Sequence, residues 1–152
     1  MNYWLMKSEP KTYSINDLER DQVTCWDGIR NYQARNFMTK EMKIGDKVFF
    51  YHSNCEVIGI YGLMKVISES YPDHTAFDKQ SKYYDAKSTK ENPRWYMVDL
   101  KFIKKFKKPI TLSNLKDYKQ STLIGCKVLA KGNRLSIVPI TKIEWNFIQT
   151  IN

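Results

Sequence analysis

The chain has 152 residues, of which 42% are hydrophobic and 27% are charged, a composition typical of one globular domain rather than a disordered segment. Lysine and arginine outnumber aspartate and glutamate by 25 to 16, and the net charge of +9 favours a polyanion such as nucleic acid as partner, although a solubilising lysine surface fits equally well. Three widely spaced cysteines argue against a disulfide framework or a zinc site, and the first ten residues resemble neither a signal peptide nor a membrane span, so we expect one cytoplasmic domain over residues 1–152.

The first twenty residues predict a strand followed by a short helix. Residues 3–6, Tyr-Trp-Leu-Met, have the composition of a short buried strand, and Pro10 ends it because proline cannot donate to a strand ladder. Ser14 stands three residues before Asp17, which is the spacing of a capping box. We therefore expect a helix from there through Arg20.

The next segments predict a turn, a second helix and a strong strand. Asp27-Gly28 makes residues 23–28 a turn. Residues 31–42 contain good helix formers and neither proline nor glycine, which predicts a helix. Residues 47–51 are rich in valine and aromatic side chains and predict a strand.

The middle of the chain combines a longer strand with a polar insertion. Residues 57–69 predict a strand in which Gly59 and Gly62 indicate a bulge or a tight bend. Residues 71–94 are polar and long for a loop without structure, which is typical of a functional or disordered segment. Tyrosines inside the insertion argue against full disorder.

The last third predicts two strands and two helical segments. Residues 95–106 alternate in the manner of a strand, and Ser113 is placed to cap a short helical turn. A further strand covers residues 134–138 and is closed by Pro139, and a capping box formed by Thr141 and Glu144 begins a last helix that runs to Ile151. These elements predict an α+β fold: a curved, mostly antiparallel, partly closed barrel of about five to six strands flanked by short helices.

Residues 25–38 are the densest polar and aromatic segment. They hold one indole, one phenol, two guanidinium groups and three side-chain amides in fourteen residues. Amides can read a base edge, rings can stack on a base, and arginine can hold a phosphate. The alternative is that Trp26 and Tyr32 belong to the core and that Arg30 and Arg35 are solvated or paired. Residue types alone leave both interpretations open.

No catalytic arrangement is present in the sequence. The serine-hydrolase elbow, the phosphate-binding P-loop and the zinc-deaminase signature are all missing, and His52 and His74 stand too far apart to suggest a metal site. We therefore predict a protein that is not an enzyme and needs no cofactor or metal. The alternative is an enzyme, or enzyme subunit, of nucleic-acid modification or restriction with an active site near His52 and Asp27.

Five segments in the expected order give the chain a resemblance to a known family. These are residues 3–10 (YWLMKSEP), 26–36 (WDGIRNYQARN), 51–54 (YHSN), 83–95 and 134–136. With them the chain resembles the EVE-domain family of the PUA-like superfamily. The resemblance implies a PUA-like pseudo-barrel and a non-catalytic reader that holds a modified base of DNA or RNA, flipped out of its strand, in an aromatic pocket. The implied partner is nucleic acid containing such a base, without a membrane.

The resemblance and the residue types together predict the site residues. Trp26 and Trp95, with Tyr32, are expected to form a cage around one extruded base. The predicted base pocket consists of Ser8, Trp26, Asn31, Tyr32, Ser53 and Trp95. The predicted phosphate or rim contacts are Lys7, Arg30, Arg35, His52, Arg134 and Ser136.

Overall fold

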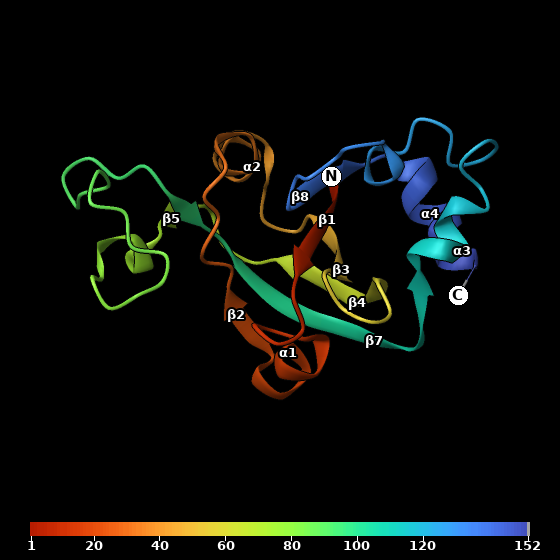
Figure 1. The fold of residues 1–152 in the computed structure, drawn as a ribbon, viewed down its shortest axis with the longest axis horizontal. Helices are drawn as coiled ribbons and strands as arrows, with labels where there is room; N and C mark the ends of the chain where they lie inside the picture. The colour runs from red at the N-terminus through yellow and green to blue at the C-terminus, as the bar shows by residue number, and fades with distance from the viewer. Residues whose placement is uncertain (152) are drawn as a thin grey trace.

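A six-stranded curled sheet forms the centre of the protein, whose structure is a computed structural model that describes residues 1–151 (Figure 1). Its strands are β1 (Tyr3–Ser8), β2 (Val23–Cys25), β3 (Lys47–His52), β4 (Gly59–Val66), β7 (Asp99–Thr111) and β8 (Ile137–Ile140). They lie in the order β2-β7-β4-β3-β1-β8. Only the β1–β3 pair is parallel, so the prediction of a curved, mostly antiparallel α+β fold is confirmed.

Short helices and a small second sheet surround this sheet. The helices are α1 (Ile15–Asp21), α2 (Tyr32–Asn36), α3 (Leu112–Lys116) and α4 (Lys142–Thr150), with a π-helical turn η1 (Phe37–Glu41) and 3-10 turns η2 (His74–Phe77) and η3 (Lys127–Leu129). The second sheet pairs β5 (Tyr71–Pro72) with β6 (Tyr96–Met97). Residues 71–94, here called the arm, project at one end of the molecule, and α3 and α4 lie at the other end (Figure 1).

Helix caps follow the sequence closely, with one exception. The capping boxes of α1, formed by Ser14 and Asp17, and of α4 are both present, as predicted. The cap of α3 is Thr111 and not Ser113, because β7 extends to Thr111 and the helix begins at the next residue. Ser113 lies inside that helix.

Strand alternation places two hydrophobic cores on the two faces of the sheet. In β1 and β3, Trp4 and Phe50 belong to one core, whereas Leu5 and Phe49 belong to the other. The parallel register pairs Leu5 with Phe49, so like-facing side chains of the two strands lie side by side. The first core packs beneath α1 and α2, and the second packs beneath α3 and α4.

The glycines of β4 predict a bulge, and the structure has one at Gly62. Even-numbered side chains before and after this bulge point to opposite faces of the sheet. The register with β7 shifts between Ile60 and Gly62, so Ile60 lies in the second core and Met64 in the first although both have even numbers. A side chain at Gly62 would stand 2.3 Å from the carbonyl oxygen of Lys104. This close approach of two backbones explains why the position carries glycine.

Several predicted boundaries need correction. Residues 23–28 are not only a turn, because β2 pairs with β7 there, and residues 31–42 divide into α2 and η1. The strand expected over 57–69 is shorter, and the one expected over 95–106 is divided between β6 and β7. The last strand lies three residues later than predicted at its start and contains Pro139, which is tolerated because β8 is an edge strand.

Candidate nucleic-acid interface

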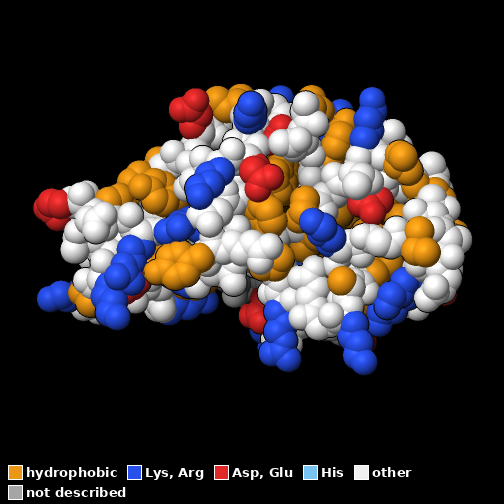
Figure 2. Space-filling model, turned by 90° about the horizontal axis from the view of Figure 1, so that it is seen from above, with side chains coloured by type: hydrophobic (Ala, Val, Ile, Leu, Met, Phe, Trp, Pro, Cys, Tyr) orange, Lys and Arg blue, Asp and Glu red, His pale blue; other side chains and the backbone are white. Residues whose placement is uncertain are grey.

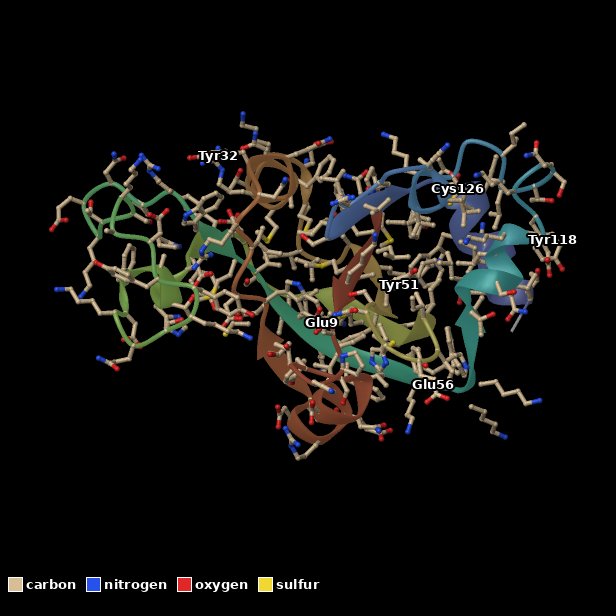
Figure 3. All side chains as sticks on the ribbon, in the orientation of Figure 1. Glu9, Tyr32, Tyr51, Glu56, Tyr118 and Cys126 are labelled. Carbon is tan, nitrogen blue, oxygen red and sulfur yellow. The ribbon has the colours of Figure 1, made fainter. Side chains whose placement is uncertain are left out.

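A cavity of about 720 Å³ opens between the end of β1, the segment that follows β2, and the arm. Three aromatic rings, two lysines and several short polar side chains line it. Its lining residues are Lys7, Ser8, Glu9, Thr12, Tyr13, Thr24, Cys25, Trp26, Asp27, Gly28, Ile29, Arg30, Lys82, Tyr83 and Ser136. Figure 3 shows Glu9 near the end of β1, apart from Tyr32, which lies at α2.

Trp26 is both a cavity wall and a core residue. Its backbone N–H donates to the carbonyl oxygen of Val98 at 2.8 Å, so the β2–β7 pairing fixes its position. Its ring meets Phe50 edge-on at 5.4 Å between centroids, and only 7% of the residue is exposed. The sequence left open whether Trp26 belongs to the core or to a binding site. In the structure the same ring packs in the core and lines the cavity, so the two interpretations do not exclude each other.

The arm is tied to the segment after Trp26 by Arg30. The guanidinium donates from Nε and Nη2 to the carbonyl oxygen of Tyr83, at 3.0 and 2.7 Å, and from Nη1 to Asp73 at 2.9 Å. Its remaining bonds reach Thr75 and its own neighbour's carbonyl. All its donors are used within the protein, so Arg30 lines the cavity but is not available as the phosphate contact that we predicted.

Asp73 is the acceptor that anchors this connection. The residue is fully buried, and its carboxylate also accepts the backbone N–H groups of Gly28 and Thr75 at 2.8 Å. Burial alone would raise the pKa of Asp73, but hydrogen bonds from Thr75, Gly28 and Arg30 outweigh it and lower the pKa. The ion pair between Arg30 and Asp73 therefore persists throughout the neutral range.

The Tyr83 ring can lie in the cavity wall because Gly28 has no side chain. Gly28 has φ +80°, and a Cβ there would lie 2.6 Å from Cζ of Tyr83. Any other residue would have to displace the ring. Tyr83 is half-buried, and the ammonium of Lys82 lies 5.0 Å from its ring centroid.

Three side chains of the cavity, Lys7, Asp27 and Cys25, have shifted pKa values because they are partly withdrawn from water. Burial lowers the pKa of Lys7, and burial with the nearby charge of Asp73 raises the pKa of Asp27. Burial also raises the pKa of the Cys25 thiol, so it stays protonated and is a poor nucleophile at neutral pH.

The structure does not bring the predicted Trp95 to this cavity. Trp95 lies at the base of the arm, where Nε1 donates to Asp85 at 2.7 Å and Tyr32 stacks on the ring at 4.8 Å. The guanidinium of Arg35 lies 4.7 Å from the Tyr32 ring and donates to the carbonyl oxygen of Arg94. Trp26 and Trp95 therefore do not form a cage, because Asp85 and Tyr32 hold Trp95 outside the cavity.

Other predicted site residues have local structural roles or lie elsewhere. Asn31 caps α2 by accepting the N–H of Ala34 at 3.0 Å, and the backbone N–H of Ser53 donates to the carbonyl oxygen of Ser8. Neither lines the cavity. Arg134 is exposed, whereas Ser8, Lys7 and Ser136 lie together in the cavity wall.

His52 is buried rather than placed at a rim. Its Nε2 accepts the N–H of Ile15, the first residue of α1, at 3.1 Å, and its ring stacks on Tyr61 at 3.9 Å. Burial lowers its pKa to about 4, so the imidazole is neutral at physiological pH. Asp27 lines the cavity and His52 does not, so the cavity does not unite the two residues of the enzyme alternative.

The predicted binding residues omit much of the cavity wall, including Tyr83, Lys82 and Asp27. The tyrosines of the arm were used as an argument against disorder and as part of the resemblance carried by residues 83–95, and nothing in their spacing indicates a contact with Gly28. Asp27 was considered only as part of an active site. Within residues 1–151, no cluster of three or more His, Cys, Asp or Glu side chains is placed to hold a metal, and no helix is long and apolar enough to cross a membrane.

Known proteins resemble this chain over nearly its whole length. The family profile of the EVE domain matches residues 2–151. Human thymocyte nuclear protein 1 is 46% identical over 166 residues, which cover 99% of this chain and 73% of that protein. A crystal structure of a Pseudomonas syringae protein has a TM-score of 0.93 at 47% identity and covers 98% of both chains. A crystal structure of human THYN1 in complex with 5-methylcytosine containing DNA has a TM-score of 0.92 at 46% identity, covering 99% of this chain and 97% of that one.

Proposed function

We propose that this chain, which belongs to the EVE-domain family, is a non-catalytic reader that binds DNA carrying a modified base such as 5-methylcytosine. The base would occupy the cavity that Trp26 and Tyr83 line. The observation that carries the proposal is this cavity, in which aromatic rings and hydrogen-bonding groups share one wall. The relative crystallised with methylated DNA supports the choice of ligand.

The energetics of base extrusion fit two rings and a few polar groups. Flipping a base out of a duplex costs a few kcal/mol. Stacking on an aromatic side chain returns roughly 1–3 kcal/mol per base. Burying the methyl group of a modified base adds about 0.8 kcal/mol. The methyl alone thus gives a preference of only a few fold, so strong discrimination requires polar contacts or a pocket shaped against the wrong base.

Basic side chains near the cavity provide contacts for phosphates. Figure 2 shows lysine and arginine side chains gathered at the end of the molecule that the arm forms. Lys79, Lys82, Lys87 and Lys90 are all exposed in that segment. We expect these lysines, rather than Arg30, to contact the phosphates of the nucleic acid, because Arg30 already donates its hydrogen bonds to the arm.

A binding role accounts for the cavity better than catalysis does. The Cys25 thiol has a raised pKa, which is the wrong direction for a nucleophile, and the neutral His52 is occupied by α1. Recovery of an oligonucleotide of unchanged mass after incubation supports the reader. An altered mass would establish an enzyme instead.

Tyr83→Ala is a sharper test than Trp26→Ala, because removing Trp26 also empties part of the core. The neighbouring Tyr84 is 39% exposed and does not line the cavity, so Tyr84→Ala is the matched control. We expect Tyr83→Ala to weaken binding of DNA with one 5-methylcytosine by about 1–3 kcal/mol and Tyr84→Ala to leave it nearly unchanged.

Affinities are measured by fluorescence anisotropy on DNA and RNA probes with different modified bases, and thermal unfolding confirms that both variants are folded. Equal affinities of Tyr83→Ala and Tyr84→Ala for every probe would refute the aromatic pocket. Preference for an RNA probe would change the ligand class but keep the site.

A further inference from the structure

Most polar groups of the cavity wall are already bonded within the protein. The hydroxyl of Ser8 donates to the carbonyl oxygen of Tyr13 at 2.7 Å, the N–H of Gly28 donates to Asp73, and Arg30 is fully engaged. Of the other charged side chains in the wall, Lys82 and Glu9 are exposed, and Glu9 accepts from Asn54, whereas Lys7 and Asp27 are half-buried. Within residues 1–151, no ion pair reaches the ammonium of Lys7, and no other residue donates a hydrogen bond to the Asp27 carboxylate.

We propose that Asp27 reads the edge of the bound base and selects a pyrimidine with an amino group at position 4 over one with a carbonyl there. This inference rests on the proposed function, because it assigns a role within the same cavity. Asp27 follows Trp26 directly in the chain, so the acceptor and the stacking ring stand next to each other. The half-buried carboxylate lacks a donor from the protein, and a ligand that donates supplies one.

The preference follows from the donors and acceptors on the two base edges. An ionised carboxylate only accepts hydrogen bonds, and cytosine offers the N4 amino group as a donor. Thymine has a carbonyl oxygen at that position, and its single edge donor, N3–H, is flanked by two carbonyl oxygens that a carboxylate repels. Burial and the nearby charge of Asp73 raise the pKa of Asp27, so a donor from the bound base would stabilise its ionised form.

Lys7 contributes the complementary donor without discriminating between the pyrimidines. Its ammonium is half-buried and lies 5.6 Å from the Tyr51 ring centroid. Both cytosine and thymine carry a carbonyl oxygen at position 2, and the backbone phosphates are the same on either side of both. Lys7 therefore strengthens binding of either base, whereas Asp27 distinguishes them.

The test compares two duplexes that differ only at the target base. One carries 5-methylcytosine and the other carries thymine, which has the same ring and the same methyl group, each opposite an abasic site so that no base pair must open. We expect the wild type to bind the 5-methylcytosine duplex roughly tenfold or more tightly. Asp27→Asn adds a donor that suits the thymine carbonyl, so we expect the ratio to fall about tenfold, towards one or below.

Matched variants separate the edge contact from a general effect of charge. Asp78→Asn makes the same substitution at an exposed residue of the arm outside the cavity, and we expect it to keep the wild-type ratio. Lys7→Met should weaken both duplexes by a similar factor. A ratio unchanged in Asp27→Asn, a wild-type ratio near one, or a ratio shifted equally by Lys7→Met overturns the role of Asp27.

Tyr83→Ala distinguishes failure of this inference from failure of the proposed function. If Tyr83→Ala weakens both duplexes while Asp27→Asn leaves their ratio unchanged, the pocket stands and the edge contact is wrong. If Tyr83→Ala weakens neither duplex, the pocket itself is wrong. Thermal unfolding of each variant checks that the loss is not one of folding.

Discussion

On the α4 side of the sheet, Phe49 and Trp145 stack at 4.0 Å between ring centroids, and the helix closes the core by apolar contact. On the other side, Arg30 and Asp73 hold the arm by hydrogen bonds and leave a cavity beside it. Apolar packing fills the available space to high density, whereas directed bonds can hold two walls at a fixed separation. The comparison indicates that the cavity lies where hydrogen bonds, rather than close apolar packing, hold the arm to the rest of the protein.

Removing Trp145 should give the largest loss of stability and no loss of recognition. The residue is 4% exposed, and Trp145→Ala leaves a void that we expect to lower the free energy of unfolding by about 3–5 kcal/mol. Urea denaturation measures this loss, and a DNA titration of the remaining folded protein should give the wild-type affinity. A changed affinity would mean that the two sides are coupled.

Breaking the polar connection should reduce both stability and affinity. Arg30→Met leaves Asp73 buried without its cation, and we expect a loss of about 3 kcal/mol in the free energy of unfolding together with weaker DNA binding, because the Tyr83 wall is released.

Arg20→Met is the control for Arg30→Met. Arg20 also pairs with aspartates, but 67% of its side chain is exposed, so we expect a loss below about 1 kcal/mol and no change in affinity. Equal losses in the two variants would show that the connection to the arm is no stronger than a surface ion pair.

Acid should lower the free energy of unfolding, because His52 is buried as a neutral imidazole. In the folded protein its pKa is lowered to about 4, whereas an unfolded histidine titrates near 6.5, so the unfolded state takes up the proton first. Stability is therefore full above about pH 6.5 and falls as the pH drops towards 4, by an amount on the order of 2 kcal/mol. His52→Gln retains an acceptor for Ile15 and should lose this part of the pH dependence in urea titrations. An identical pH profile in the variant would contradict the assignment.

The smallest expected effect is on the salt dependence of DNA binding, where a lysine beside the cavity and a lysine of α4 should differ. DNA affinity is expected to fall as salt rises, and Lys82→Ala should reduce the slope of log affinity against log salt by about one unit. Lys142→Ala, an exposed lysine at the start of α4, should leave the slope unchanged. Equal slopes for the two variants would place the phosphates elsewhere on the surface.

Features that depend on neighbouring residues could be predicted from the sequence. The apolar residues 3–6 and the valine and aromatic residues of 47–51 indicated strands. Ser14 and Thr141 marked helix starts, because a cap bonds within its own first turn. The bulge in β4 was also indicated by its glycines. These signals were sufficient for the fold class and the order of most elements.

Contacts between distant segments could not be predicted from residue types. Whether Arg30 holds a phosphate or the arm depends on Asp73, 43 residues away, and Trp95 is occupied by partners that local sequence does not indicate. Ser8 and Trp26, which were predicted from the motifs, line the cavity, but the motifs could not distinguish a cavity ring such as Tyr83 from a stacked ring such as Trp95.

The central position of β1 has a kinetic consequence. This strand is made early, yet it lies between β3 and β8, and Tyr3 pairs with Lys47 on one side and Ile140 on the other. Contacts so far apart along the chain slow folding, since a long loop must close before the pairing is gained. Until residues 137–140 leave the ribosome, β1 presents an open edge to other chains. The strand that supplies Lys7 and Ser8 thus gains its second neighbour only when β8 pairs with it.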